Sequence, residues 1–228
     1  MPAPAGLALV VHRLPADDPS RPLRLRYLVA GDPAAVRWPR ALAAGEEPRR
    51  DGLWRHTCFE AFVAAPAGCG SGYVEYNFAP SGAWAIYRFD GYRQGMRSEP
   101  APVAPRIVVT RAAAGTTAID VAAAWPSDVA TEVADVAVAG TVTGVTSTAT
   151  STAAVAATTA TVVTAAAIAA ADPPGAVPPA GVPRIRLGLS AVLEAADGSL
   201  SYWALHHPSA RPDFHNEGGF LLELEVPG

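Results

Sequence analysis

The side chains best suited to chemistry lie in one stretch, residues 52–94, whose first segment is Leu53–Val63. In a β-strand, successive side chains point to opposite faces. One face of this segment would carry Trp54, His56, Cys58, Glu60 and Phe62. An indole, an imidazole and a carboxylate together are unusual in a hydrophobic core, so we expect Trp54 and Glu60 to contact a ligand. If this face meets a second sheet instead, the same residues would form a polar core.

The next segments, Tyr73–Phe78 and Ala83–Phe89, are typical of a hairpin. Pro80–Gly82 lies between them and favours a tight reversal, because Pro fixes φ and Gly permits a positive φ. We expect Glu75 and Arg88 to be partners across the two strands. On one interpretation they form a salt bridge on a solvated sheet face.

The second interpretation of this hairpin is a sugar-binding patch. Sugars stack their C–H faces on indole or phenol rings, and carboxylate, amide and guanidinium groups hold their hydroxyls. The hairpin supplies these groups as Trp84, Glu75, Asn77 and Arg88. We therefore assign all four to the predicted ligand site.

A third group lies near the C-terminal end, where three of the five histidines fall within ten residues. The group consists of His206, His207, Asp213 and His215. Such a set could hold a metal, but the spacing matches no metal motif and adjacent strand residues point in opposite directions. The alternatives are histidines that hydrogen-bond to backbone and a share in the ligand pocket, for which we select Trp203 and His207.

Several chemistries lack the residues they need. The formal charge of −4 gives no footprint for nucleic acid, and all seventeen basic residues are Arg, which excludes a Lys nucleophile. No phosphate-binding loop or Gly-x-Ser-x-Gly elbow is present. His56 and Cys58 suggest a nucleophile pair, but no orienting acid or oxyanion device accompanies them. The sequence does not decide whether the chain is an enzyme, although it favours a non-catalytic protein without a cofactor.

The two cysteines, Cys58 and Cys69, are too few for a disulfide scaffold. Cys58 lies in a predicted strand, and we interpret it as a buried thiol. Spacing alone does not decide whether it is bridged to Cys69.

Most of the chain shows strand patterns and little helical periodicity, which predicts an all-β, antiparallel β-sandwich. Asp197-Gly198 is a strong hairpin signal between two of these strands, and residues 33–51 are expected to be a long connection. The predicted strands are Gly6–Val11, Leu23–Val29, Leu53–Val63, Tyr73–Phe78, Ala83–Phe89, Arg106–Thr110, Ala118–Ala124, Ile185–Glu194, Leu200–His206 and Phe220–Val226.

Residues 126–183 interrupt this pattern with a stretch dominated by Ala, Thr and Val. We interpret it as a low-complexity insertion in a single domain spanning 1–228. The alternatives are an extra Val/Thr-rich strand or Ala-rich helix, and a membrane span at 153–171. Ala and Thr insert poorly into bilayers, so we expect no membrane span. The N-terminus lacks a basic region before its apolar run, so we predict no signal peptide and a cytoplasmic location.

Residues 52–94 and 185–224 resemble the bacterial DOMON-like domain proteins, which are related to the family-nine carbohydrate-binding modules. The resemblance rests on Leu53–Phe62, Tyr76–Trp84, Tyr87–Arg93 and Leu189–Glu194, followed by Ser201–Leu205 and Pro212–His215. It implies a β-sandwich whose relatives bind sugars or, in other branches, haem. Haem needs axial ligands such as His and Met, and Met96 is the internal methionine.

We therefore predict a non-catalytic ligand-binding module with a carbohydrate-like small molecule as its ligand. One alternative is a haem or metal protein that uses Met96 with His206, His207 or His215. The other is a structural domain without a small ligand. We expect no nucleic-acid or membrane partner.

Overall fold

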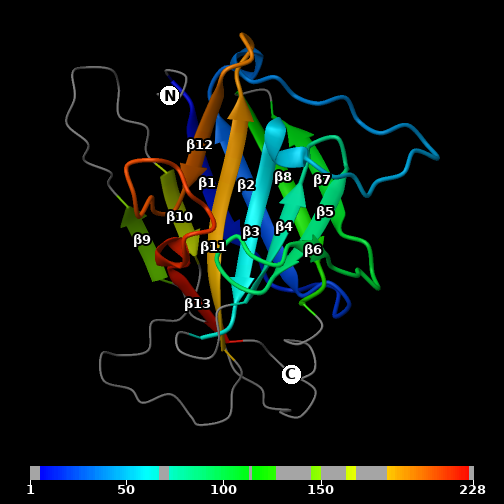
Figure 1. The fold of residues 1–228 in the computed structure, drawn as a ribbon. Coiled ribbons are helices and arrows are strands. Elements are labelled where there is room, and N and C mark those ends of the chain that lie inside the picture. Colours follow the sequence, from blue (N-terminus) through cyan, green and yellow to red (C-terminus); the bar gives the residue numbers. More distant parts are fainter. Residues whose placement is uncertain are drawn as a thin grey trace.

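A computed structural model describes residues 6–66, 72–112, 115–126, 145–149, 163–167 and 184–225. Two β-sheets lie face to face, and the described connections contain only short 3-10 helices (Figure 1). The predicted all-β sandwich is therefore confirmed. The described strand pairs are antiparallel, except that β1 and β10 run parallel.

The first sheet has the strand order β7-β8-β2-β1-β10-β9. Its strands are β1 (Ala8–Arg13), β2 (Leu23–Ala30), β7 (Arg106–Arg111), β8 (Thr116–Ala123), β9 (Val145–Ala149) and β10 (Val163–Ala167). Burial alternates strictly along β2, with Leu23, Leu25 and Tyr27 fully buried and the arginines between them facing outward. This period of two is the pattern of a sheet with one solvated face.

The second sheet has the order β12-β11-β3-β4-β5-β6, and β13 pairs with the other end of β11. Its strands are β3 (Cys58–Ala64), β4 (Tyr73–Phe78), β5 (Trp84–Phe89), β6 (Arg97–Ser98), β11 (Arg184–Glu194), β12 (Leu200–Ala204) and β13 (Leu222–Glu225). The predicted Asp197-Gly198 hairpin joins β11 to β12, with Gly198 at φ 87°. Strands β3 and β4 are buried along their whole length, so this sheet is covered on both faces.

The inner face of the second sheet, which meets the first sheet, is apolar. Phe59, Ala61 and Val63 of β3 pack there against the first sheet's leucines and valines. The Tyr27 hydroxyl crosses the sandwich and donates a 2.8 Å hydrogen bond to the carbonyl oxygen of Glu60. The Phe59 side of β3 therefore faces the core.

The outer face of the second sheet is covered by loops and not by another sheet. The chain around residues 90–96 and the segment 205–221 cross this face, the latter in orange and red in Figure 1. Phe220 lies directly over Gly188 of β11, where an added Cβ would lie 2.5 Å from the ring. Phe62, Tyr73, Tyr87 and Phe220 belong to a second apolar cluster on this side.

The structure departs from the predicted elements most clearly in two places. The segment expected to be one strand over Leu53–Val63 begins as a 3-10 helix, η2 (Leu53–Arg55), and the strand starts at Cys58. Within 126–183 the structure describes the two short strands β9 and β10, as in the interpretation with an added strand. The rest of the predicted insertion, including most of 153–171, lies outside the described residues. No helix among the described residues is long and apolar enough to cross a membrane.

Candidate functional site

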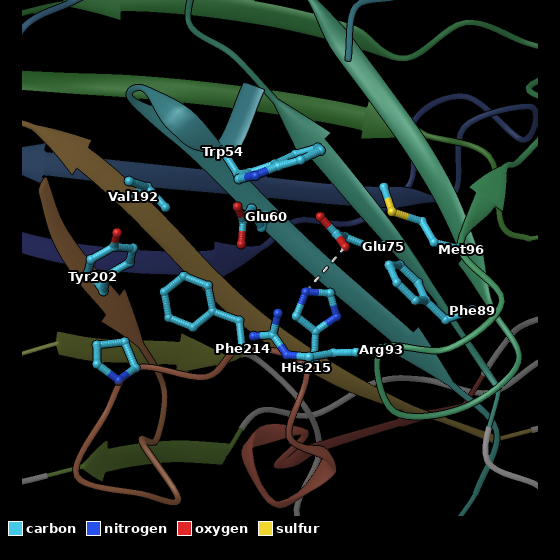
Figure 2. Close-up of a pocket in the computed structure, with 11 residues that line it drawn as sticks. Trp54, Glu60, Glu75, Phe89, Arg93, Met96, Val192, Tyr202, Phe214 and His215 are labelled. Atoms are coloured by element: carbon cyan, nitrogen blue, oxygen red, sulfur yellow. Dashed lines mark ion pairs between the residues drawn. The ribbon is translucent and has the colours of Figure 1, made fainter. Parts of the chain in front are cut away.

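A cavity of about 350 Å³ opens on the outer face of the second sheet, beneath the covering loops. Side chains from the sheet form its floor, and side chains from the loops and η2 form its walls (Figure 2). The lining residues are Trp54, Glu60, Glu75, Phe89, Arg93, Met96, Val192, Tyr202, Pro212, Phe214 and His215. The shape and lining of this cavity fit a ligand site, because ligand sites are concave, mostly apolar and contain a few convergent polar groups.

Two carboxyl groups lie on the floor, and strand pairing places them there. Glu60 of β3 is opposite Asn77 of β4, and Glu75 is two residues from Asn77 on the same face. Glu60 is 2% exposed and Glu75 is 4% exposed. The Ser190 hydroxyl donates a 3.0 Å hydrogen bond to Glu60 Oε2, and the Asn77 amide donates a 2.6 Å hydrogen bond to Glu75 Oε1.

Burial and the neighbouring charge of Glu75 raise the pKa of Glu60 to about 8. Burial also raises the pKa of Glu75. A carboxylate loses hydration when it is buried, and a second carboxylate close by makes ionisation of both unfavourable. The pair therefore holds a proton near neutral pH, so it can both donate and accept hydrogen bonds.

His215 stands beside this pair. The backbone N–H of Arg93 donates to the Tyr73 hydroxyl at 3.2 Å, and that hydroxyl lies 2.8 Å from His215 Nδ1. If Nδ1 accepts the tyrosine proton, the hydrogen of a neutral imidazole is on Nε2. Nε2 faces Glu75 Oε2 at 3.8 Å. Burial, followed by the charge of Arg93, lowers the pKa of His215 to about 4.

Arg93 brings the guanidinium group to the cavity wall, on a turn with a left-handed backbone at φ 53°. Its Nη2 donates a 2.8 Å hydrogen bond to Asp213 Oδ1, and the Tyr92 hydroxyl donates to the other oxygen at 2.7 Å. A non-glycine residue with positive φ is uncommon. This ion pair joins the two covering loops, and Asp213 offsets the arginine charge.

The rest of the wall is aromatic. Trp54 reaches the cavity from η2 and packs edge-on against Tyr87 at 5.7 Å. Tyr202 of β12 is 40% exposed, and its ring lies 6.1 Å from Phe214. Figure 2 shows Trp54, Phe89 and Phe214 arranged around the two carboxyl groups. These rings offer stacking surfaces to a ligand.

The structure brings together half of the predicted site. Trp54, Glu60 and Glu75 line the cavity. Asn77 is fully buried beneath it, where its amide orients Glu75 and its carbonyl oxygen lies 3.5 Å from Cys58 Sγ.

Three predicted contacts lie on the opposite side of the sheet and are corrected. Trp84 and Trp203 are buried in the inner core, where Trp203 donates to the Ser201 hydroxyl at 2.9 Å. Arg88 shares the side of Trp84 on β5 and donates two hydrogen bonds to Glu99, at 2.8 and 2.9 Å. The predicted Glu75–Arg88 pair is wrong, since Glu75 lies opposite Tyr87 and Arg88 lies opposite Val74. The register of the hairpin explains this error. Tyr87 is the residue that shares a sheet face with Glu75, and the side chain of Arg88, one residue further along β5, points to the other face.

His207 is also outside the residues that line the cavity, although its ring lies 6.0 Å from Phe214. The histidine of the C-terminal segment that reaches the cavity is His215. Sequence reasoning weighed this residue as a metal or haem ligand, a partner of backbone groups or part of the pocket, and Met96 as a haem ligand, but selected neither for the ligand site. It missed Arg93, Tyr202 and the aromatic wall, which loop geometry brings to the site.

The covalent and metal chemistries are not supported by the geometry. Cys58 is fully buried, and burial raises the pKa of its thiol. His56 turns away from it and lies 2.8 Å from Glu194. Cys69 lies outside the described residues. Among the described residues no group of three or more His, Cys, Asp or Glu is placed to hold a metal.

The alternative of a haem protein stays a prediction. Met96 and His215 line the same cavity. His215 Nδ1 lies 2.8 Å from the Tyr73 hydroxyl, and Nε2 lies 3.8 Å from Glu75 Oε2. Haem iron would need one of these nitrogens as an axial ligand, and Nε2 is the one that lies beyond hydrogen-bond length from its neighbour.

No family model matches the chain, and no curated protein or solved structure matches it either. The cavity itself is therefore the evidence that bears on function.

Proposed function

We propose that the protein is a ligand-binding β-sandwich module without catalytic activity, whose cavity takes a carbohydrate-like small molecule. The observation that carries this proposal is the pairing of buried Glu60 and Glu75 with the rings of Trp54 and Tyr202 around one cavity. A polyhydroxylated ring presents C–H faces that stack on aromatic side chains, and hydroxyls that hydrogen-bond to carboxyl groups.

Further support comes from the construction of the floor. The carboxyl groups are held by Ser190 and Asn77 on strands, so little conformational freedom is lost when they contact a ligand. The cavity volume of about 350 Å³ is that of a small-molecule site.

The test is a thermal-shift screen of the purified chain against monosaccharides, sugar acids, amino sugars and cyclic polyols. A ligand that binds the folded state raises the melting temperature. Each positive compound is then titrated by calorimetry into the wild type and into Trp54→Ala. We expect Trp54→Ala to weaken binding by about tenfold or more, through the lost stacking surface.

Trp38→Ala is the matched control. Trp38 is also a partly buried tryptophan, but it packs against the inner core, and its indole donates to the Pro33 carbonyl oxygen at 3.0 Å. We expect this variant to bind as the wild type does. A screen without a single stabilising compound, or equal losses in both variants, would overturn the proposal.

A further inference from the structure

The two carboxyl groups of the cavity differ from the other buried carboxyl groups in the described chain. Glu99 is paired with Arg88 at 2.8 Å, and Glu194 is paired with Arg37 at 2.7 Å. Neither Glu60 nor Glu75 has an arginine within salt-bridge distance among the described residues. Buried carboxylates ordinarily have a cationic partner, because removing them from water is costly.

Each of the two groups also has an oxygen left for a ligand. The described residues give Glu60 Oε1 no hydrogen-bond partner, since Ser190 donates to Oε2. Glu75 Oε2 has His215 Nε2 at 3.8 Å, which is beyond hydrogen-bond length. Figure 2 shows both carboxyl groups directed into the same open space.

The walls around this space favour a cation. Trp54, Phe89 and Phe214 line the cavity together with Tyr202. The faces of such rings attract ammonium groups, more strongly where water is excluded. Arg93, the arginine that lines the cavity, is paired with Asp213 at 2.8 Å, and its charge still acts to lower the pKa of Glu75, against the larger effect of burial.

We propose that the cavity recognises its ligand through a protonated amine that binds between Glu60 and Glu75, so that the ligand class is an amine-bearing polyol such as an amino sugar. This inference rests on the proposed function and names its ligand class. An ammonium group supplies three donors, enough for the two open oxygens and one further acceptor.

Binding of an amine should displace the proton that the Glu60–Glu75 pair holds. The free carboxyl pair holds a proton near neutral pH, and an arriving ammonium favours ionisation of both groups. The carboxyl proton is then released to the buffer, while the amine keeps its own. Binding should therefore release protons, to an extent that falls to zero above the pKa values of the pair.

The experiment compares matched compounds that differ in one group: glucosamine with glucose, N-acetylglucosamine as the uncharged amide, and cyclohexylamine with cyclohexanol. Titration calorimetry at pH 7 in two buffers of different ionisation enthalpy gives both affinity and proton release. We expect each amine to bind at least about tenfold more tightly than its neutral counterpart, with net proton release. Because acetylation changes only the ligand, this comparison does not depend on any variant folding.

Glu75→Gln adds a test on the protein. We expect it to reduce the preference for amines about tenfold or more, while Glu194→Gln, a buried carboxyl outside the cavity lining, keeps that preference. Glucose binding as well as glucosamine would overturn the amine inference and leave the proposed function standing. Cyclohexylamine binding without any sugar would overturn the proposed function and keep the cation site. If none of the compounds binds, both fail.

Discussion

The two faces of the second sheet are built from alternate residues of the same strands, yet they differ in kind. On β3, Phe59 and Ala61 face the first sheet, while Glu60 between them faces the cavity. On β12, Trp203 is buried in the inner core, while Tyr202 is 40% exposed. The inner face is closed by another regular sheet. The outer face is closed by irregular loops, which leave a cavity and allow polar groups to remain.

Burial alone therefore does not identify the core. Glu60 and Phe59 are almost equally inaccessible, at 2% and 0% exposed. Phe59 is buried by tight packing, including a ring contact with Tyr27 at 5.0 Å. Glu60 is buried at the bottom of an opening. Substitutions on the two faces should therefore affect different properties of the protein.

The largest expected effect is on the inner face. Phe59→Ala removes a fully buried ring and leaves a hole between the sheets, which should lower the free energy of unfolding by about 3–5 kcal/mol. Urea denaturation followed by fluorescence measures this loss. At temperatures where the variant is folded, it should bind the ligands found by the screen with unchanged affinity. A small loss of stability would contradict the closely packed inner face.

An intermediate effect is expected at Glu60, and it depends on pH. The folded-state pKa of about 8 lies above the unfolded value near 4.5, so the folded chain holds a proton that the unfolded chain has lost. This contribution to the free energy of unfolding is fully present below pH 4.5, falls by about 1.4 kcal/mol per pH unit between the two pKa values, and is lost as pH rises through 8.

Glu60→Gln replaces the protonated carboxyl by a neutral amide. From pH 6 to pH 8 we expect the wild type to lose about 2 kcal/mol more than this variant, judged by urea midpoints at each pH. Glu217→Gln, a partly exposed carboxylate paired with Arg186 outside the cavity, serves as the reference. If the urea midpoints of the wild type and Glu60→Gln changed in parallel with pH, burial would not raise the pKa of Glu60.

The smallest effect on stability is expected at the rim of the cavity. Tyr202→Ala removes a side chain that is 40% exposed, so the free energy of unfolding should change by no more than about 0.5 kcal/mol. Ligand binding should weaken about tenfold, because the ring is a stacking surface. The result to look for is separation of the two properties: a change in stability with unchanged affinity would place Tyr202 outside the site.

The hairpin shows how far sequence reasoning reaches. Alternation correctly placed Glu75 and Asn77 on one face of their strand, because parity within a strand is a local property that needs no knowledge of partners. The register of β3 against β4 then puts Glu60 opposite Asn77. Alternation failed for Arg88 and Trp84, because the parity of one strand relative to the next depends on the turn between them. Trp54 does line the predicted site, but it lies in a 3-10 helix and not in the strand that the alternation predicted.

The residues alone indicate the all-β class, most of the strands, and two unusual carboxyl groups, each on its own strand. Period-two patterning and turn residues carry that information along the chain. The fold brings the two carboxyl groups to one side of the second sheet, covers that side with loops, and adds Arg93, Tyr202, Phe214 and His215 there. These residues come from turns and distant segments, whose positions depend on contacts across the fold, such as the Arg93–Asp213 ion pair. No local pattern encodes such contacts.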